Sequence, residues 1–142
     1  MALVLDTGPL YASLDPRDPA HLRCRALIES ATEPRVIPSP VLVEVDYWVT
    51  EYVSPGLFAQ FLQDIEDGAY QVADLRREDY SRVRELRTRY ADARIGFVDA
   101  AVLAVVERLN EPKLATLDQR HFRLLRPRHV EALRLLPEEA KK

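Results

Sequence analysis

The feature that most constrains the fold of this 142-residue chain is the alternation of short apolar runs with longer helical patterns. The runs have the length of buried strands and lie at residues 2–5, 36–37, 70–73, 113–116 and 132–136. Alternation of this kind is typical of α/β proteins with a parallel sheet. The sequence therefore predicts an α/β sandwich with a central, mainly parallel sheet of about four to five strands.

The helical patterns between these runs have clear start and stop signals. They cover residues 9–14, 19–30, 40–53, 57–65, 77–90 and 96–109. Asp18-Pro19 and Ser39-Pro40 each combine a good N-cap with a proline suited to a first helical turn. No repeat, linker or low-complexity segment divides the chain, so residues 1–142 are predicted to form a single domain.

Composition indicates a globular protein of a reducing compartment. Hydrophobic residues make up 47% of the chain and charged residues 30%, which is ordinary for such a protein. The only cysteine is Cys24, so no disulfide can form within the chain. The N-terminus lacks a basic region, and the longest apolar stretch, residues 97–106, contains Asp99. We expect a cytoplasmic protein without a membrane span.

The net charge of −3 excludes an overtly basic nucleic-acid binder, but the charge is uneven. Residues 1–71 carry 4 basic and 11 acidic side chains, whereas residues 72–142 carry 16 basic and 12 acidic. The arginines of the second half form either an ordinary solvated face or a surface that contacts phosphates, since polyanions need only local positive charge. The candidates for RNA phosphate contacts are Arg82, Arg89, Arg94, Arg120 and Arg123.

Four acids occupy positions where a charged side chain is costly. Asp6 and Asp118 directly follow predicted strands, and ligand sites of parallel sheets lie at the carboxyl ends of strands. Asp99 lies inside a helix that is apolar nearly all round, and Glu44 is flanked by valines and a leucine. A buried acid must be paired, protonated or bound to a metal ion.

A divalent cation would relieve the repulsion between converging carboxylates, and oxygen ligands favour Mg²⁺ or Mn²⁺. The three histidines, His21, His121 and His129, lack the spacing of a zinc site. Structural roles remain open for single acids. Asp6 and Asp118 are also suited to turns or caps, and Glu44 to a solvated helix face.

The four acids stand in sequence contexts that resemble the motifs of the PIN-domain family, most closely its VapC-type toxins. The matching segments are Val4-Leu5-Asp6-Thr7-Gly8-Pro9-Leu10, Glu44 on the helix after the second strand, Gly96-Phe97-Val98-Asp99-Ala100-Ala101, and Ala115-Thr116-Leu117-Asp118-Gln119-Arg120-His121-Phe122. The resemblance covers essentially the whole chain. It implies a three-layer α/β/α fold and a Mg²⁺- or Mn²⁺-dependent endoribonuclease, often a homodimer, that a small antitoxin neutralises.

The resemblance also implies roles for particular residues. Asp6, Asp99 and Asp118 would hold the cation, with Glu44 as a further ligand or as a base. Thr7 and Thr116 would place hydroxyl groups near the metal or the substrate. Water attack in line with the leaving 3′ oxygen would then give a 5′-phosphate and a 3′-hydroxyl.

Further residues carry two interpretations each. Asp92, in the loop before the helix of Asp99, is a candidate neighbour of the metal and otherwise an ordinary loop acid. Tyr11, Tyr47 and Trp48 lie either at a dimer or antitoxin surface or in the core.

Other functional classes fit less well. Asp6-Thr7-Gly8 matches the active-site string of aspartic proteases, but the pattern that follows is helical. A dehalogenase-type phosphatase would have a second aspartate at Gly8, and Lys113 is poorly placed for a phosphoreceiver domain. The main alternative is a PIN-like module that binds RNA or protein without cutting. Retention of all four acids argues against it.

Overall fold

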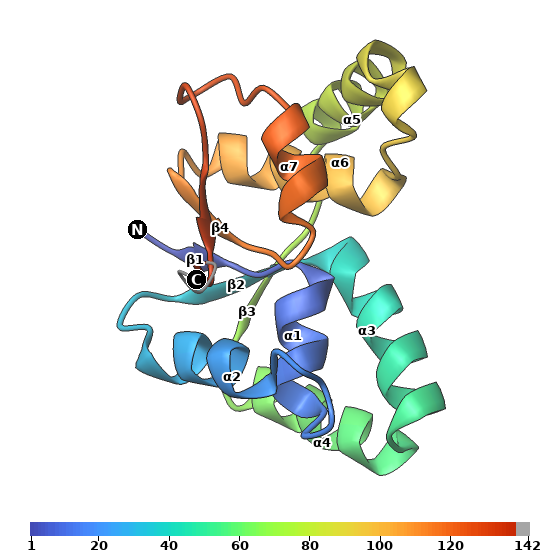
Figure 1. Cartoon of the computed structure of the whole chain (residues 1–142), viewed down its shortest axis with the longest axis vertical. Helices are drawn as coiled ribbons and strands as arrows, with labels where there is room; N and C mark the ends of the chain where they lie inside the picture. Colours follow the sequence, from blue (N-terminus) through green and yellow to red (C-terminus); the bar gives the residue numbers. More distant parts are fainter. Residues whose placement is uncertain (139–142) are drawn as a thin grey trace.

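In the computed structural model, which describes residues 1–138, helices cover both faces of a parallel sheet (Figure 1). The strands are β1 (Leu3–Val4), β2 (Arg35–Pro38), β3 (Gln71–Ala73), β4 (Lys113–Ala115) and β5 (Arg134–Leu136). One sheet has the order β1-β2-β3, and β4 pairs with β5, with every pairing parallel. A parallel bridge between Leu5 and Ala115 brings β4 beside the end of β1. The predicted parallel α/β architecture is confirmed.

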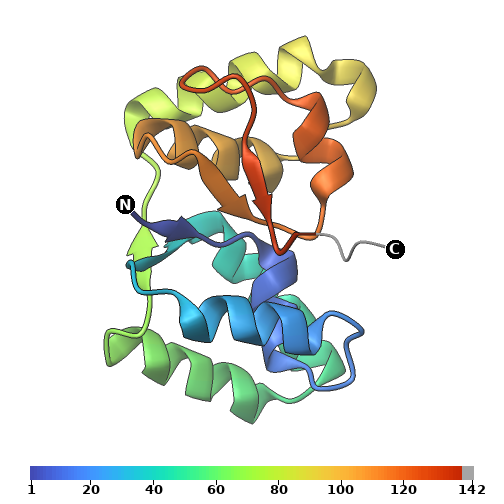
Figure 2. The same ribbon diagram turned by 60° about the vertical axis from the view of Figure 1, so that its left-hand side comes forward.

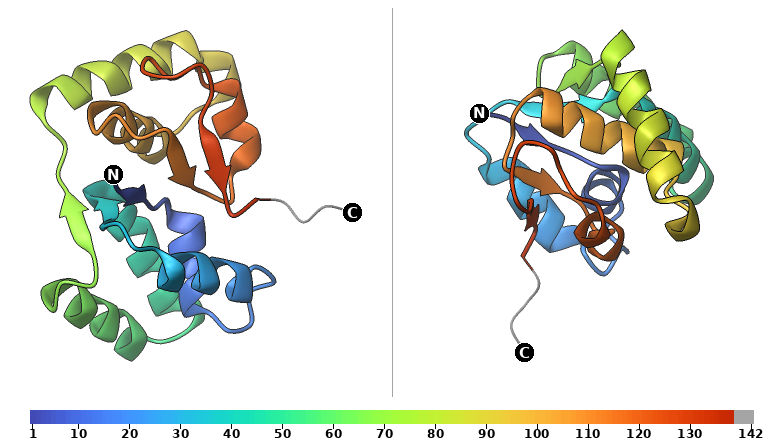
Figure 3. Two further views of the ribbon diagram at one scale, coloured as in Figure 1. Left: turned by 90° about the vertical axis from the view of Figure 1, so that its left-hand side faces the viewer. Right: turned by 90° about the horizontal axis from the view of Figure 1, so that it is seen from above.

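The helices form two layers that enclose the strands (Figures 2 and 3). The helices on one side are α1 (Thr7–Leu14), α2 (His21–Ser30), α3 (Ser39–Tyr52) and α4 (Pro55–Glu66). Those on the other side are α5 (Arg77–Arg89), α6 (Phe97–Arg108) and α7 (Gln119–Leu124), with the short 3₁₀ helix η1 (Ala91–Ala93) between α5 and α6. Within the described residues, none of these helices has both the length and the apolar composition needed to cross a membrane.

Helix α6 is the central helix of the hydrophobic core. Its residues from Ala100 to Val106 are all buried, which explains why the sequence is apolar on every face of this helix. Val41, Val45 and Val49 recur every four residues on α3 and are fully buried against the same core. Burial of α6 and of one face of α3 fixes where their acidic side chains, Asp99 and Glu44, emerge.

Some helix boundaries differ from those expected. Helix α1 begins at Thr7, because Asp6 already occupies the N-cap position. Helix α2 begins at His21 and not at residue 19. The Oδ1 atom of Asp18 accepts a hydrogen bond from the backbone N–H of Ala20 at 2.8 Å, so Asp18 stabilises a turn ahead of the helix.

Arg82 has a structural role that excludes the predicted RNA contact. It is 5% exposed, and its Nε atom lies 2.7 Å from Oε1 of Glu107, whose side chain is 8% exposed. Its Nη1 atom lies 2.9 Å from Oε1 of Glu85. The guanidinium therefore joins α5 to α6 in the interior, where a phosphate of bound RNA cannot reach it.

We predict that Arg82→Ala destabilises the protein by about 3 kcal/mol or more, because it leaves the largely covered carboxylate of Glu107 without its ion-pair partner. Urea unfolding followed by circular dichroism measures this loss. Arg77→Ala, on an exposed position of the same helix, is the matched control and should change stability by less than about 0.5 kcal/mol. Equal stability of the two variants would show that the buried ion pair contributes nothing.

Candidate metal centre

Two adjacent strand ends bring Asp6 and Asp118 to the same edge of the sheet. The backbone N–H of Asp6 donates to the carbonyl of Ala115 at 2.9 Å. The fully buried Thr116 then links the two acids. Its hydroxyl donates to Oδ2 of Asp6 at 2.8 Å and accepts from the backbone N–H of Asp118 at 3.0 Å. One threonine hydroxyl thus orients the first and the last acid of the sequence.

Glu44 reaches this edge from α3. Its neighbours Val41 and Val45 are buried, while Glu44 itself is half-buried. The hydroxyl of Thr7, in the first turn of α1, donates to Oε1 of Glu44 at 2.6 Å. Thr7 and Thr116, which were predicted to lie near a metal or substrate, thus each donate a hydrogen bond to one of the four acids.

Asp99 lies in the first turn of α6 and is half-buried. Beside it is His121, whose Nδ1 atom is 2.8 Å from Oδ2 of Asp118 and 3.8 Å from Oδ2 of Asp99. One potential ligand atom from each of these three residues lies within 4.8 Å of the other two. Such spacing lets one cation contact all three side chains.

His121 was not predicted as part of the site. No histidine or cysteine lies at zinc-ligand spacing from His121, so a histidine–cysteine pattern does not mark it as a ligand. The available signal was its position three residues after Asp118, which places both side chains on the same side of the short helix α7.

Burial and mutual repulsion disfavour the charged forms of two of the acids. Burial, with a smaller effect from the charges of Asp99 and Glu44, raises the pKa of Asp6 to about 7, although hydrogen bonds from Thr7 and Thr116 oppose the shift. Burial, followed by the charge of Asp118, raises the pKa of Asp99 to about 6. The four acids therefore form one electrostatically coupled cluster.

The residues present fit a divalent cation. Carboxylate oxygens are the ligands that Mg²⁺ and Mn²⁺ favour, and a cation would offset both the burial and the repulsion that raise these pKa values. Asp99, Asp118 and His121 form the tightest group of possible ligands. Asp6 and Glu44 lie outside this group of three, and the two threonine hydroxyls hold their carboxylates in place.

Asp92 is not brought into the cluster. It is exposed in η1, and the contacts among the described residues join it to none of the four acids.

The remaining predicted arginines, Arg89, Arg94, Arg120 and Arg123, are exposed. The guanidinium of Arg89 lies over the ring of Tyr90, 5.5 Å from its centroid, and Arg123 donates to Oε1 of Gln119 at 3.3 Å. Exposure leaves an RNA contact possible for all four.

Exposed aromatic side chains gather on α3. Tyr47 is 58% exposed and Trp48 42% exposed, so the interpretation of these two as core residues is wrong. The ring of Trp48 lies 5.3 Å from those of Tyr47 and Tyr52 and 6.5 Å from that of Tyr11. We call these four side chains the aromatic surface.

Comparison with known proteins agrees with this geometry. A profile of the PIN domain matches residues 3–126, a span that includes all four acids. The chain belongs to the PIN-domain family. Its curated relatives include Ribonuclease VapC26 of Mycobacterium tuberculosis, strain ATCC 25618 / H37Rv, which is 31% identical over 125 residues, or 88% of this chain and 93% of the relative.

Two solved structures share the fold of this chain. VapC20 of M. tuberculosis, described as a sarcin-ricin loop cleaving toxin, has a TM-score of 0.73 at 17% identity over 79% of this chain and 86% of its own. VapBC2 from Rickettsia felis, solved bound to a promoter DNA fragment, has a TM-score of 0.69 at 19% identity over 95% of this chain and 97% of its own.

We predict that Asp6→Asn stabilises the metal-free PIN domain at high pH. The pKa of Asp6 is higher in the folded protein than its ordinary value of 3.8, so folding retains a proton between about pH 4 and 7. The contribution of Asp6 to stability therefore falls as pH rises through this window. Because asparagine never ionises, Asp6→Asn should raise Tm by about 5 °C at about pH 8 and change it little near pH 4.

Thermal unfolding in EDTA between about pH 4 and about pH 8 measures the change in Tm, and Asp92→Asn, at an exposed position, is the control. An Asp6→Asn variant that melts at or below the wild-type temperature at high pH would contradict the proposed cost of ionising Asp6.

Proposed function

We propose that this PIN domain is a metal-dependent endoribonuclease and the toxin of a toxin–antitoxin pair. The observation that carries this proposal is the convergence of four acids from separate helices and strand ends on one electrostatically coupled site. The relative named Ribonuclease VapC26 and the toxin description of VapC20 support RNA as the substrate.

Asp99 and Asp118, with His121 beside them, would hold the cation, and Asp6 and Glu44 would complete its surroundings. A bound Mg²⁺ or Mn²⁺ would neutralise charge on the phosphodiester and make water a better nucleophile.

The protein's own groups would position the reaction. With Oε1 of Glu44 held by Thr7, its Oε2 atom is left to take a proton from the attacking water. The water oxygen bonds to phosphorus as the bond to the 3′ oxygen breaks, and that oxygen takes up a proton from solvent. The products are a 5′-phosphate and a 3′-hydroxyl.

The aromatic surface would bind a protein partner. Four neighbouring aromatic rings, with Tyr47, Trp48 and Tyr52 well exposed, make a surface suited to burial in an interface. We propose a small antitoxin as one partner and a second copy of the chain as another. The R. felis structure carries the name of a VapBC pair, which supports the antitoxin. A cytoplasmic location would suit an RNA-cleaving toxin.

The second candidate function is a PIN-like module that binds RNA without cutting. The raised pKa values of Asp6 and Asp99 favour the nuclease, because a scaffold without a cation gains nothing from carboxylates that are costly to ionise.

We predict that the purified protein cleaves total cellular RNA with Mg²⁺ or Mn²⁺ and that EDTA abolishes cleavage. Asp99→Asn should lower the rate by about 100-fold or more, because it removes a charged ligand from the cluster. Gel electrophoresis and sequencing of 5′-phosphorylated ends measure the products. Asp92→Asn, which changes an exposed acid outside the cluster, should cleave at the wild-type rate.

Cleavage by Asp99→Asn at the wild-type rate would refute the acid site. A folded, antitoxin-free protein that cuts no RNA with either metal would favour the binding module.

Thr116→Val tests the hydroxyl that orients Asp6 and Asp118. Valine keeps the shape but makes neither hydrogen bond, so the rate of RNA cleavage should fall by about tenfold or more. Thr116→Ser keeps the hydroxyl and should retain most of the activity. If both variants cleave equally well, the bridge does not position the acids.

A further inference from the structure

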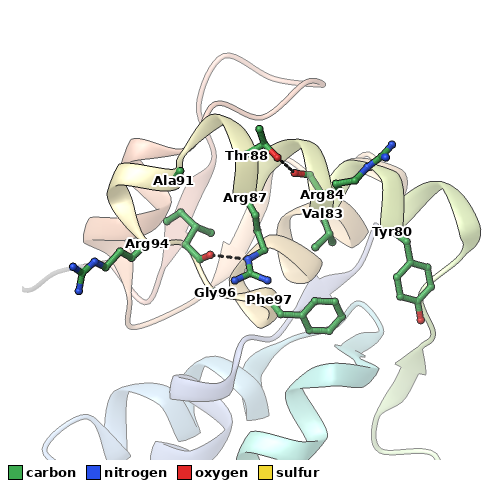
Figure 4. A pocket seen from close by; sticks show the side chains of 10 residues that line it. Tyr80, Val83, Arg84, Arg87, Thr88, Ala91, Arg94, Gly96 and Phe97 are labelled. Atoms are coloured by element: carbon green, nitrogen blue, oxygen red, sulfur yellow. Dashed lines mark hydrogen bonds between the residues drawn. The ribbon is translucent and has the colours of Figure 1, made fainter.

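A cavity of about 650 Å³ lies between α5 and the start of α6 (Figure 4). Arg84, Arg87 and Arg94 line it together with the aromatic rings of Tyr80 and Phe97, and no acidic side chain is among the described residues around it. We call it the arginine cavity. Its positive charge stands in contrast to the neighbouring acid cluster.

The three arginines differ in how they are held. The Nε atom of Arg87 donates to the carbonyl of Ile95 at 3.2 Å, which fixes its guanidinium between α5 and the start of α6 and leaves its Nη atoms for other acceptors. Figure 4 shows Arg84 and Arg94 extending outward on either side of Arg87. Within the described residues, neither Arg84 nor Arg94 pairs with a carboxylate. The cavity therefore presents unneutralised cationic donors.

Tyr80 and Phe97 connect the arginine cavity to the acid cluster. Both also line a second cavity of about 400 Å³, whose wall includes Glu44 and Val98. Tyr80 is 55% exposed and Phe97 42% exposed, so each ring offers a face to a ligand. Phe97 precedes Asp99 by two residues on α6. Positive charge, aromatic rings and the acid cluster therefore follow one another along a continuous surface.

We propose that this surface binds single-stranded RNA next to the cleavage site, with a base against Phe97 and Tyr80 and the neighbouring phosphates in the arginine cavity. The proposal rests on the nuclease function and assigns its substrate a strand path. The arginines can contact the phosphates of an unpaired strand, and the adjacent aromatic rings can stack against its exposed bases. A paired strand would keep its bases stacked inside the helix, away from these rings.

The residues of this path were only partly predicted. Arg94 was a candidate, whereas Arg84, Arg87 and Phe97 were not. The signal was present on α5, because residues 80, 84 and 87 are spaced by four and three and share one helix face.

Binding of a fluorescent single-stranded RNA of about twelve nucleotides, followed by anisotropy at several salt concentrations, tests the arginines. Every protein carries Asp99→Asn, so that the RNA stays intact in Mg²⁺ buffer. Adding Arg84→Gln and Arg94→Asn should weaken RNA binding about tenfold or more. The plot of log K for binding against log salt should become less steep, by about 1.4 in the magnitude of its slope. Asparagine suits position 94, where φ is +53°.

The charge-matched control adds Arg23→Gln and Arg25→Gln, on α2 in the opposite helix layer, and should bind RNA as the Asp99→Asn protein does. Thermal melts of all variants report whether they are folded.

Phe97→Ala tests the base contact. It should weaken binding about tenfold without changing the salt slope, because stacking involves no phosphate. Phe97→Tyr keeps an aromatic face and should bind as tightly as phenylalanine.

Arginine variants that bind RNA like the charge-matched control would overturn the strand path, as would a parent protein that binds no single-stranded RNA. Cleavage by the protein with Asp99 intact is measured in parallel and separates the two proposals. If the arginine variants bind RNA more weakly but the protein with Asp99 intact cleaves no RNA, the strand path is supported and the nuclease is rejected. If the protein with Asp99 intact cleaves RNA but the arginine variants bind RNA as tightly as their parent, the nuclease is supported and the strand path is rejected.

Discussion

The site depends on one backbone contact, the pairing of the end of β1 with the end of β4 through Leu5 and Ala115. This contact sets two segments more than a hundred residues apart side by side, and Thr116 then bonds to both Asp6 and Asp118. Without the parallel register, the two acids would not share a sheet edge. Helices α1 and α3 begin directly after the paired strands β1 and β2. Their N-terminal ends therefore lie close together, and Thr7 donates a hydrogen bond to Glu44.

The acid cluster lowers the stability of the metal-free fold and at the same time favours binding of a cation. Burial removes hydration from the carboxylates of Asp6 and Asp99, and neighbouring acids repel them, which together raise the pKa values of both. The same strain makes the cluster receptive to a cation. The arginines on this side of the sheet differ from one another in their environments. Arg82 is neutralised inside the fold by Glu107, whereas Arg84 and Arg94 remain available on the surface. The acid cluster and the arginine cavity thus lie next to each other at the α5–α6 layer.

Sequence reasoning succeeded where a residue's environment is set by its immediate neighbours. The place of Asp99 in a buried helix, and of Asp6 and Asp118 after strands, could be predicted because buried helices and strand ends have short-range signatures. It failed where the environment depends on distant contacts. Arg82 resembles any exposed helix arginine until Glu107, 25 residues later, is folded against it. His121 becomes part of the site only because α7 turns back toward α6. The exposure of Tyr47 and Trp48 likewise depends on the face by which α3 packs.

Titration calorimetry with Mn²⁺ shows whether the four acids form a divalent cation site. We expect Mn²⁺ to bind the wild-type protein and to release protons near pH 6, because the cation displaces protons held by carboxylates with raised pKa values. Binding should be lost in Asp99→Asn and kept in Asp92→Asn. If the folded wild-type protein binds no Mn²⁺, or if Asp99→Asn binds it equally well, the four acids do not form the cation site.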